Sequence, residues 1–239
     1  MPNGMKEKVV WLQDQREVRY DAGRFSILRD LRREADRVGS VLGPGWSVHG
    51  SIARGDVKRT SDIDLIFTAV VQSYMVEFQL QRAGIELLRR EVVMATPNSS
   101  PKGHIQLGNE VTVTFPLVGL RPQEEAFYRF GGILPAAGLE RAPRVPGVSK
   151  QLLLILPTEA GHIESSIIGK EAETARLLKI PVEVVLERER VLARRDRIGR
   201  TGVYLREEVP ECSTFEETLK FFSDRDPVVR HTTGGKRKR

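Results

Sequence analysis

Two aspartates separated by one residue stand in the part of the chain most suited to chemistry. Asp62 and Asp64 begin the run DIDLIF, which is typical of a β-strand. Side chains of a strand alternate between its faces, so both carboxylates are expected to point the same way. Neighbouring carboxylates repel each other unless a cation lies between them, and their hard oxygen atoms suit Mg²⁺. The pair therefore predicts a site for Mg²⁺ or Mn²⁺ on a strand.

A glycine and a serine precede the aspartates, and ten residues separate Ser51 from Asp62. Gly50 has no side chain, so its backbone can approach a phosphate closely. Ser51 adds a hydroxyl and an amide at the expected start of a short helix. Arg54 and Lys58 follow in the connecting loop and are expected to neutralise phosphate charge. Together these residues predict a binding loop for a nucleoside triphosphate.

This arrangement resembles the signature of nucleotidyltransferases of the DNA polymerase beta superfamily. That signature has a hydrophobic residue, Gly, then Gly or Ser, a loop, and Asp-hydrophobic-Asp-hydrophobic. Ile63 and Leu65 occupy its hydrophobic positions, whereas His49 departs from the usual residue before the glycine. The resemblance covers roughly residues 21–120. It implies transfer of a nucleotidyl group to a hydroxyl, with metal held by Asp62 and Asp64.

The family places a third carboxylate on a later strand, where it deprotonates the acceptor hydroxyl or completes the metal shell. The matching segment here, GNEVTVTFPLVG, resembles the corresponding strand of archaeal CCA-adding enzymes. Thr112 and Thr114 stand in the expected positions, and a threonine is no base near neutral pH. Glu110 precedes Thr112 by two residues, so we expect it on the same face and predict that it substitutes for the missing carboxylate.

The elements around these residues follow from periodicity and turn residues. Apolar residues recur every three or four positions from Asp21 to Leu42, which predicts a helix that Gly43-Pro44-Gly45 ends. Gly108-Asn109 is a hairpin turn between two alternating runs. Further predicted elements are a strand or packing arm in 1–20, strands at 46–49 and 62–67, a helix at 73–93, and hairpin strands at 104–107 and 110–115.

A second region follows a Gly- and Pro-rich stretch at 131–150. Predicted helices at 170–178 and 182–195 flank a break at Lys179-Ile180-Pro181, and a short strand at 200–205 follows Gly199. This order resembles a winged helix-turn-helix domain, which implies contact with nucleic acid. Acidic residues in the same helix oppose that role, and a packing or dimerisation domain stays open. The candidate contacts are Arg188, Arg190, Arg194, Arg195, Arg197 and Arg200.

Composition agrees with a globular protein and limits its chemistry. The 239 residues carry a net charge of +6, which favours a polyanionic partner. The single cysteine, Cys212, excludes an internal disulfide and a cysteine-based metal site. No apolar run is long enough for a membrane helix or a signal peptide, so we expect a cytoplasmic protein without membrane contact.

The sequence thus predicts an α/β (α+β) protein in three parts. A polymerase-beta-like nucleotidyltransferase domain is expected at 1–135, a winged-helix-like domain at 150–222 and a basic tail at 223–239. The leading hypothesis is a metal-dependent enzyme that uses a nucleoside triphosphate. The missing third carboxylate favours an alternative, a DNA-binding regulator that senses a nucleotide without turnover.

Overall fold

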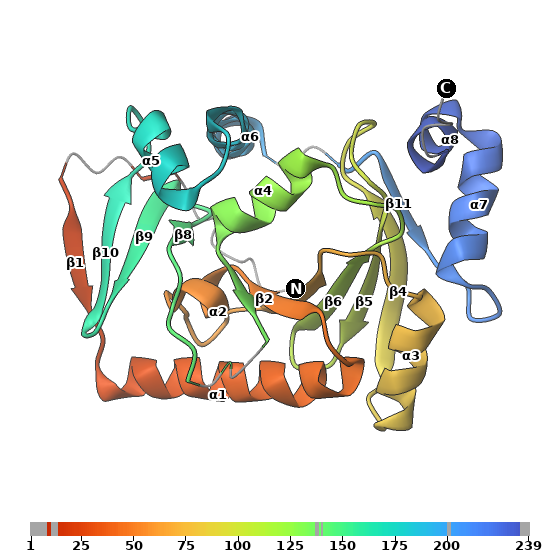
Figure 1. The fold of residues 1–239 in the computed structure, drawn as a ribbon, viewed down its shortest axis with the longest axis horizontal. Helices are drawn as coiled ribbons and strands as arrows, with labels where there is room; N and C mark the ends of the chain where they lie inside the picture. Colours follow the sequence, from red (N-terminus) through yellow and green to blue (C-terminus); the bar gives the residue numbers. More distant parts are fainter. Residues whose placement is uncertain (1–8, 11–13, 137–138, 140, 200–201, 235–239) are drawn as a thin grey trace.

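The computed structural model describes residues 9–10, 14–136, 139, 141–199 and 202–234. Within them the protein has a mixed α/β fold with two sheets, α1 along one side and α4 and α6 along the other (Figure 1). Helix α1 spans Ala22–Gly39, α4 spans Pro122–Gly131 and α6 spans Val182–Ile198. The predicted α/β class is therefore confirmed at this level.

The larger sheet carries the strands around the predicted site. Its central strands β3 and β6 run parallel, and its other neighbouring pairs run antiparallel. The strand order is β11 (Leu205–Glu208), β4 (Leu87–Met94), β5 (Lys102–Leu107), β6 (Val111–Pro116), β3 (Ile63–Phe67), β2 (Trp46–His49) and β7 (Ile133–Pro135). The predicted strands at 46–49 and 62–67 and the hairpin at Gly108-Asn109 are confirmed, with shifts of one or two residues at their ends.

One face of this sheet is apolar and packs on α1. Leu65, Val113 and Ile105, from three adjacent strands, are fully buried there. Asp21 caps α1, because its Oδ1 accepts a hydrogen bond from the amide of Arg24 at 2.7 Å. A 3-10 turn, Ser40–Leu42, continues the helix up to Gly43, as predicted. The apolar side chains of this face and of α1 form the main core. Asp64 and Thr112 lie on the opposite face of the sheet.

The predicted helix at 73–93 is wrong in its second half. Helix α3 spans only Ser73–Arg82, and residues 87–94 form β4 between β5 and β11. Gly84 has φ +70, a left-handed conformation that ends the helix at no steric cost. Beyond it, Val92 and Met94 are buried within the sheet. Pairing with β5 and with β11, which lies far along the chain, thus overrides the helical periodicity of the segment.

The smaller sheet and two further helices lie beside the first part of the chain. The sheet has the order β1 (Arg16–Arg19), β10 (Gly161–Ser166), β9 (Leu153–Thr158) and β8 (Gly147–Val148). Helix α5 (Glu171–Leu178) precedes α6, and Lys179 between them is left-handed at φ +54. Phe130 of α4 packs in one core with Leu178 of α5 and Val185 of α6. The two predicted helices are confirmed, and they share a core with the first region.

Strand pairing does not follow the predicted boundary at 131–150. Strand β1 pairs with β10, and β11 pairs with β4 in the register Leu205↔Met94. The segment that follows α6 therefore joins the large sheet at Leu205–Glu208, which places the strand predicted at 200–205 later in the chain. Arg200 and Thr201 lie outside the described residues. Without β11 the outer edge of β4 would be unpaired. The two strands are far apart in the sequence, so local patterns could not indicate this pairing.

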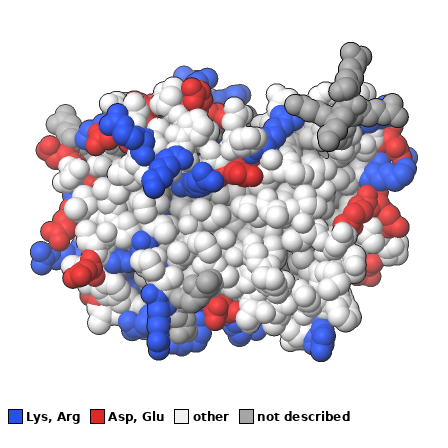
Figure 2. All heavy atoms as spheres, viewed as in Figure 1, with Lys and Arg blue, Asp and Glu red and all other residues white. Residues whose placement is uncertain are grey.

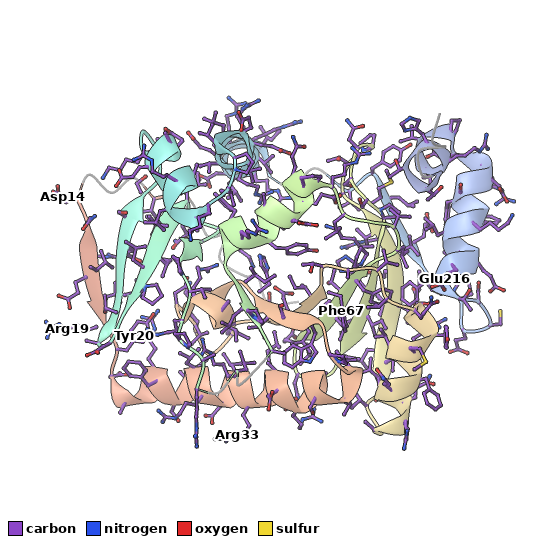
Figure 3. All side chains as sticks on the ribbon, in the orientation of Figure 1. Asp14, Arg19, Tyr20, Arg33, Phe67 and Glu216 are labelled. Atoms are coloured by element: carbon purple, nitrogen blue, oxygen red, sulfur yellow. The ribbon has the colours of Figure 1, made fainter. Side chains whose placement is uncertain are left out.

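The predicted basic tail is largely helical. Helix α7 spans Phe215–Arg225 and α8 spans Pro227–Thr233, while residues 235–239 lie outside the described residues. Phe215 is fully buried against Phe115 of β6, with ring centroids 5.1 Å apart. Glu216, labelled in Figure 3, accepts a hydrogen bond of 2.6 Å from Ser73 of α3. These contacts fix α7 to the large sheet and to α3.

Candidate functional site

The Gly-Ser pair and the aspartates are neighbours through the register of β2 and β3. His49, the last residue of β2, lies opposite Asp64. Gly50 follows at φ +77, and a Cβ added to it would have no atom within 4 Å, while its amide donates to the carbonyl oxygen of Gly132 at 2.9 Å. Ser51 then begins α2, Ser51–Arg54. The structure therefore brings together the two halves of the predicted site.

The two aspartates differ in burial. The side chain of Asp62 is 57% exposed, and its Oδ2 lies 4.0 Å from Nζ of Lys150. Asp64 is far more buried, and burial, with a smaller contribution from the charge of Asp62, raises the pKa of its carboxyl group. Lys150 opposes this rise. The mutual repulsion expected from the sequence is present, and a cation beside the pair would relieve it.

Thr112 and Thr114 lie where the sequence comparison placed them. In the parallel register of β3 and β6, Thr112 lies beside Asp64 and Thr114 beside Ile66. Partners in this register share a face of the sheet, so both threonines are on the aspartate side. Thr114 is buried and Thr112 is partly exposed. The position next to Asp64 thus carries a hydroxyl group.

Glu110 lies just before β6, and its carbonyl oxygen accepts a hydrogen bond of 3.1 Å from the amide of Ile63 at the start of β3. It belongs to the turn between β5 and β6, where Asn109 has φ +57 and Glu110 φ +56. The left-handed backbone interrupts the strand alternation that placed Glu110 on the face of Thr112. Its side chain is exposed, and no three His, Cys, Asp or Glu residues in the described ranges form a possible metal-binding group. Glu110 is therefore a turn residue beside the start of β3, and its role as the substitute for the third carboxylate stays a prediction.

Arg54 has a structural role in place of the expected contact with phosphate. It is buried in α2, forms an ion pair with Asp56 at 2.9 Å, and donates to the carbonyl oxygens of Gly131 and Val148. These acceptors engage the outer nitrogens of the guanidinium and hold α2 against the end of α4, while its buried Nε has no partner among the described residues. Lys58 is exposed in the loop, and its amide donates to Oγ of Ser61 at 2.9 Å.

Aromatic residues of α4 cover the inner part of the polar face. The rings of Phe127 and Tyr128 lie 5.9 and 5.4 Å from the ring of His49. Burial, reinforced by several nearby cations, lowers the pKa of His49 to about 3, so the ring is neutral. Lys102 lies 5.1 Å from the Tyr128 ring and pairs with Glu124 at 3.4 Å. The sequence offered no local signal for these contacts or for Lys150, because each joins distant segments.

The arginines predicted to bind nucleic acid divide into two groups. Arg188 faces inward, and its guanidinium carbon lies 4.8 Å from the centroid of the Phe127 ring. Arg200 lies outside the described residues. The others are exposed on α6: Arg190, Arg194, Arg195 and Arg197.

Two surface hollows lie away from the aspartates. One, of about 500 Å³, lies between α1, β2 and β7 and includes Trp46 and Pro135. The other, of about 390 Å³, is lined by Phe25, Arg32 and Arg144 among others. In Figure 2 the charged side chains concentrate in the upper part of the face and along its margins, and a wide central area is uncharged. The positive net charge is therefore not gathered into one patch on this face.

Comparison with known proteins identifies no family or relative for this chain. No protein-family model matches the chain, and no curated protein matches its sequence. Among the described residues, no helix is long and apolar enough to cross a membrane.

Proposed function

We propose that this protein is a metal-dependent nucleotidyltransferase with a polymerase-beta-like domain, which transfers a nucleotidyl group from a nucleoside triphosphate to a hydroxyl acceptor. One observation carries the proposal. The open Gly50-Ser51 turn leaves β2 beside the strand that holds Asp64, with Asp62 just before that strand. A phosphate-binding turn and a carboxylate pair thus lie within reach of a single substrate.

The chemistry of the donor set fits magnesium. Mg²⁺ binds through one or two carboxylates, keeps several waters and takes further ligands from substrate phosphates. Asp62 and Asp64 supply such a pair, and the exposed Asp62 leaves room for water and substrate. When bound, the ion would neutralise phosphate charge and stabilise the leaving pyrophosphate.

The protein's own residues then account for binding and orientation. Ser51 binds the triphosphate in the space that Gly50 leaves free of a side chain, and Lys150 beside Asp62 adds positive charge. The acceptor oxygen forms a bond to the α-phosphorus while the bond to the pyrophosphate oxygen breaks. Thr112 cannot accept the acceptor's proton, which passes to water or to a phosphate oxygen. We therefore expect slow transfer, or transfer to an acceptor that is already ionised.

A second candidate is a nucleotide sensor that binds the triphosphate without turnover. Thr112 beside Asp64 favours it, because a threonine is no general base and adds no negative charge to a metal shell. The exposed arginines of α6 would then contact nucleic acid phosphates. Their binding should weaken steeply with salt, since each phosphate contact releases counterions.

Labelled substrate distinguishes the two candidates. We would incubate the protein with α-³²P-labelled triphosphates and Mg²⁺ or Mn²⁺, with and without RNA, and measure label on RNA or on the protein. Transfer should disappear in Asp64→Asn and persist in Asp30→Asn, an exposed control on α1. Metal-dependent nucleotide binding without labelled product supports the sensor. If neither binding nor product is detected, both candidates are refuted.

A further inference from the structure

Arg188 occupies the buried stripe of α6. Val184, Arg188 and Leu192 are spaced four residues apart and therefore share one face of the helix. Val184 and Leu192 are buried in the core, and the Arg188 guanidinium lies over the Phe127 ring at 4.8 Å. Burial lowers the pKa of Arg188 to about 10, so the group stays charged. A charged side chain thus stands where a packing residue is expected.

The described residues provide no hydrogen-bond acceptor for the inner nitrogen of this guanidinium. Nε of Arg188 is buried without a hydrogen-bond partner among them, and no carboxylate in the described ranges forms an ion pair with Arg188. Nε of the buried Arg54 also has no partner, but the outer nitrogens of Arg54 reach Asp56 and carbonyl oxygens, whereas the outer nitrogens of Arg188 have no hydrogen-bond partner among the described residues. A buried donor without an acceptor costs stability, and such an exception calls for a ligand or a function.

The position of Arg188 connects it to the aspartate site. Phe127, on which it lies, contacts His49, and His49 is the register partner of Asp64. The charges of Arg188 and Lys150 both act on the His49 ring. Two cations from the later part of the chain therefore border the face that carries Asp62 and Asp64. A ligand that complements both the cations and a metal-holding carboxylate pair carries several negative charges.

We propose that Arg188 and Phe127 form a phosphate-binding subsite at the edge of the aspartate face, in which phosphate oxygens accept hydrogen bonds from the outer nitrogens of the partly buried Arg188 guanidinium. The identity of the whole ligand rests on the proposed function, whereas the anion subsite does not. The phosphate belongs either to the triphosphate tail or to the backbone of an acceptor strand. In both cases the inner face of α6 serves this site, and only its outer arginines remain for a nucleic acid groove.

Calorimetric titration with two simple probes tests the subsite. The first probe is inorganic tripolyphosphate with Mg²⁺, and the second is a short oligonucleotide without triphosphate. We expect Arg188→Gln to lower the affinity for whichever probe occupies the subsite about tenfold, the usual loss for a charge-assisted hydrogen bond. Arg188→Lys should recover only part of it, because lysine lacks the planar fork. Arg82→Gln, at an exposed position of α3, is the matched control and should bind as the wild type does.

Thermal unfolding separates a ligand contact from a packing contact. Arg188→Met keeps an apolar stem on Phe127 and removes the unpaired donor. We expect the ligand-free variant to melt no lower than the wild type, and to gain less melting temperature from tripolyphosphate. Melting several degrees lower without ligand would identify Arg188 as a structural contact and overturn the proposal.

The outcomes also distinguish this inference from the proposed function. If Arg188→Gln weakens binding of tripolyphosphate alone, the subsite belongs to the triphosphate tail. If it weakens binding of the oligonucleotide alone, the subsite belongs to the acceptor strand. Unchanged affinity for both probes in Arg188→Gln overturns the subsite, even if the wild type transfers nucleotides. Arg188-dependent binding in a protein that neither transfers nor binds nucleoside triphosphates supports the subsite and refutes the function.

Discussion

Thr112 lies beside Asp64 in the parallel register of β6 and β3. Both residues belong to the face that α4 partly covers, and Thr112 is partly exposed. In the family that the sequence resembles, a carboxylate on this later strand would act on the acceptor hydroxyl. Under the proposed function, Thr112 is therefore the residue that decides between slow transfer and nucleotide binding without turnover.

Replacing Thr112 by aspartate should raise the transfer rate. A carboxylate beside Asp64 can take the acceptor's proton, and a positioned general base typically contributes about 100-fold or more. Product formation from α-labelled triphosphate measures the effect. Thr112→Asn, of similar size but uncharged, is the control and should stay at the wild-type rate. A Thr112→Asp protein that binds the metal-nucleotide complex and turns over no faster would contradict the prediction.

His104 should make the protein less stable in mild acid. Burial, helped by the charges of Lys102 and Arg206, lowers its pKa from 6.5 to about 4. Between pH 6.5 and pH 4, His104 is protonated in the unfolded chain but stays neutral in the folded protein. Its contribution to stability is therefore present above pH 6.5 and is lost as the pH falls toward 4.

The substitution His104→Gln removes this titration. We expect the loss of unfolding free energy between pH 7 and pH 4 to shrink by about 2–3 kcal/mol. Urea unfolding at both pH values measures it. His231→Gln, at an exposed position of α8, should leave the loss unchanged. An equal loss in wild type and His104→Gln would show that other groups cause the acid sensitivity.

Gly103 should tolerate no side chain. A Cβ at this position of β5 would lie 2.5 Å from the ring of Phe115, which is fully buried against Phe215. We expect Gly103→Ala to lower the unfolding free energy by about 1–3 kcal/mol, as overpacking does. Gly108→Ala is the control, since no atom lies within 4 Å of its added Cβ. Equal urea midpoints for the two variants would contradict this packing.

The predicted first domain, 1–135, should not fold stably alone. It lacks β11, which covers the edge of β4, and Phe215, which covers Phe115. It also lacks β10, the partner of β1. We expect this fragment to aggregate or to unfold at lower urea than the full chain, as measured by circular dichroism and size-exclusion chromatography. A soluble fragment with the full-length midpoint would contradict this expectation and support the predicted boundary.

Features that depend on neighbouring residues were predictable from the sequence. The turn at Gly108-Asn109, the end of the first helix at Gly43 and the strands on both sides of the Gly-Ser loop follow from local turn and periodicity rules. The side-by-side placement of Gly50 and Asp64 follows because β2 and β3 are consecutive in the chain and pair directly.

Features that depend on distant partners were not predictable in this way. Residues 87–94 become a strand because β5 and β11 flank them, and Arg54 turns inward because Asp56 and two carbonyl groups accept its hydrogen bonds. For Glu110 the reason is local. The tight turn predicted at Gly108-Asn109 extends through Glu110, so the alternation of the following strand begins only at Val111.

The amino-acid sequence by itself determined the paired aspartates, the open glycine and the threonine in place of a carboxylate, because residue type and short spacing suffice for these. Only the tertiary structure decided that Lys150 lies beside Asp62 and that Arg188 lies on Phe127. Such contacts join segments far apart in the chain. The free energy that selects them comes from burial and pairing in the complete fold, which no local pattern encodes.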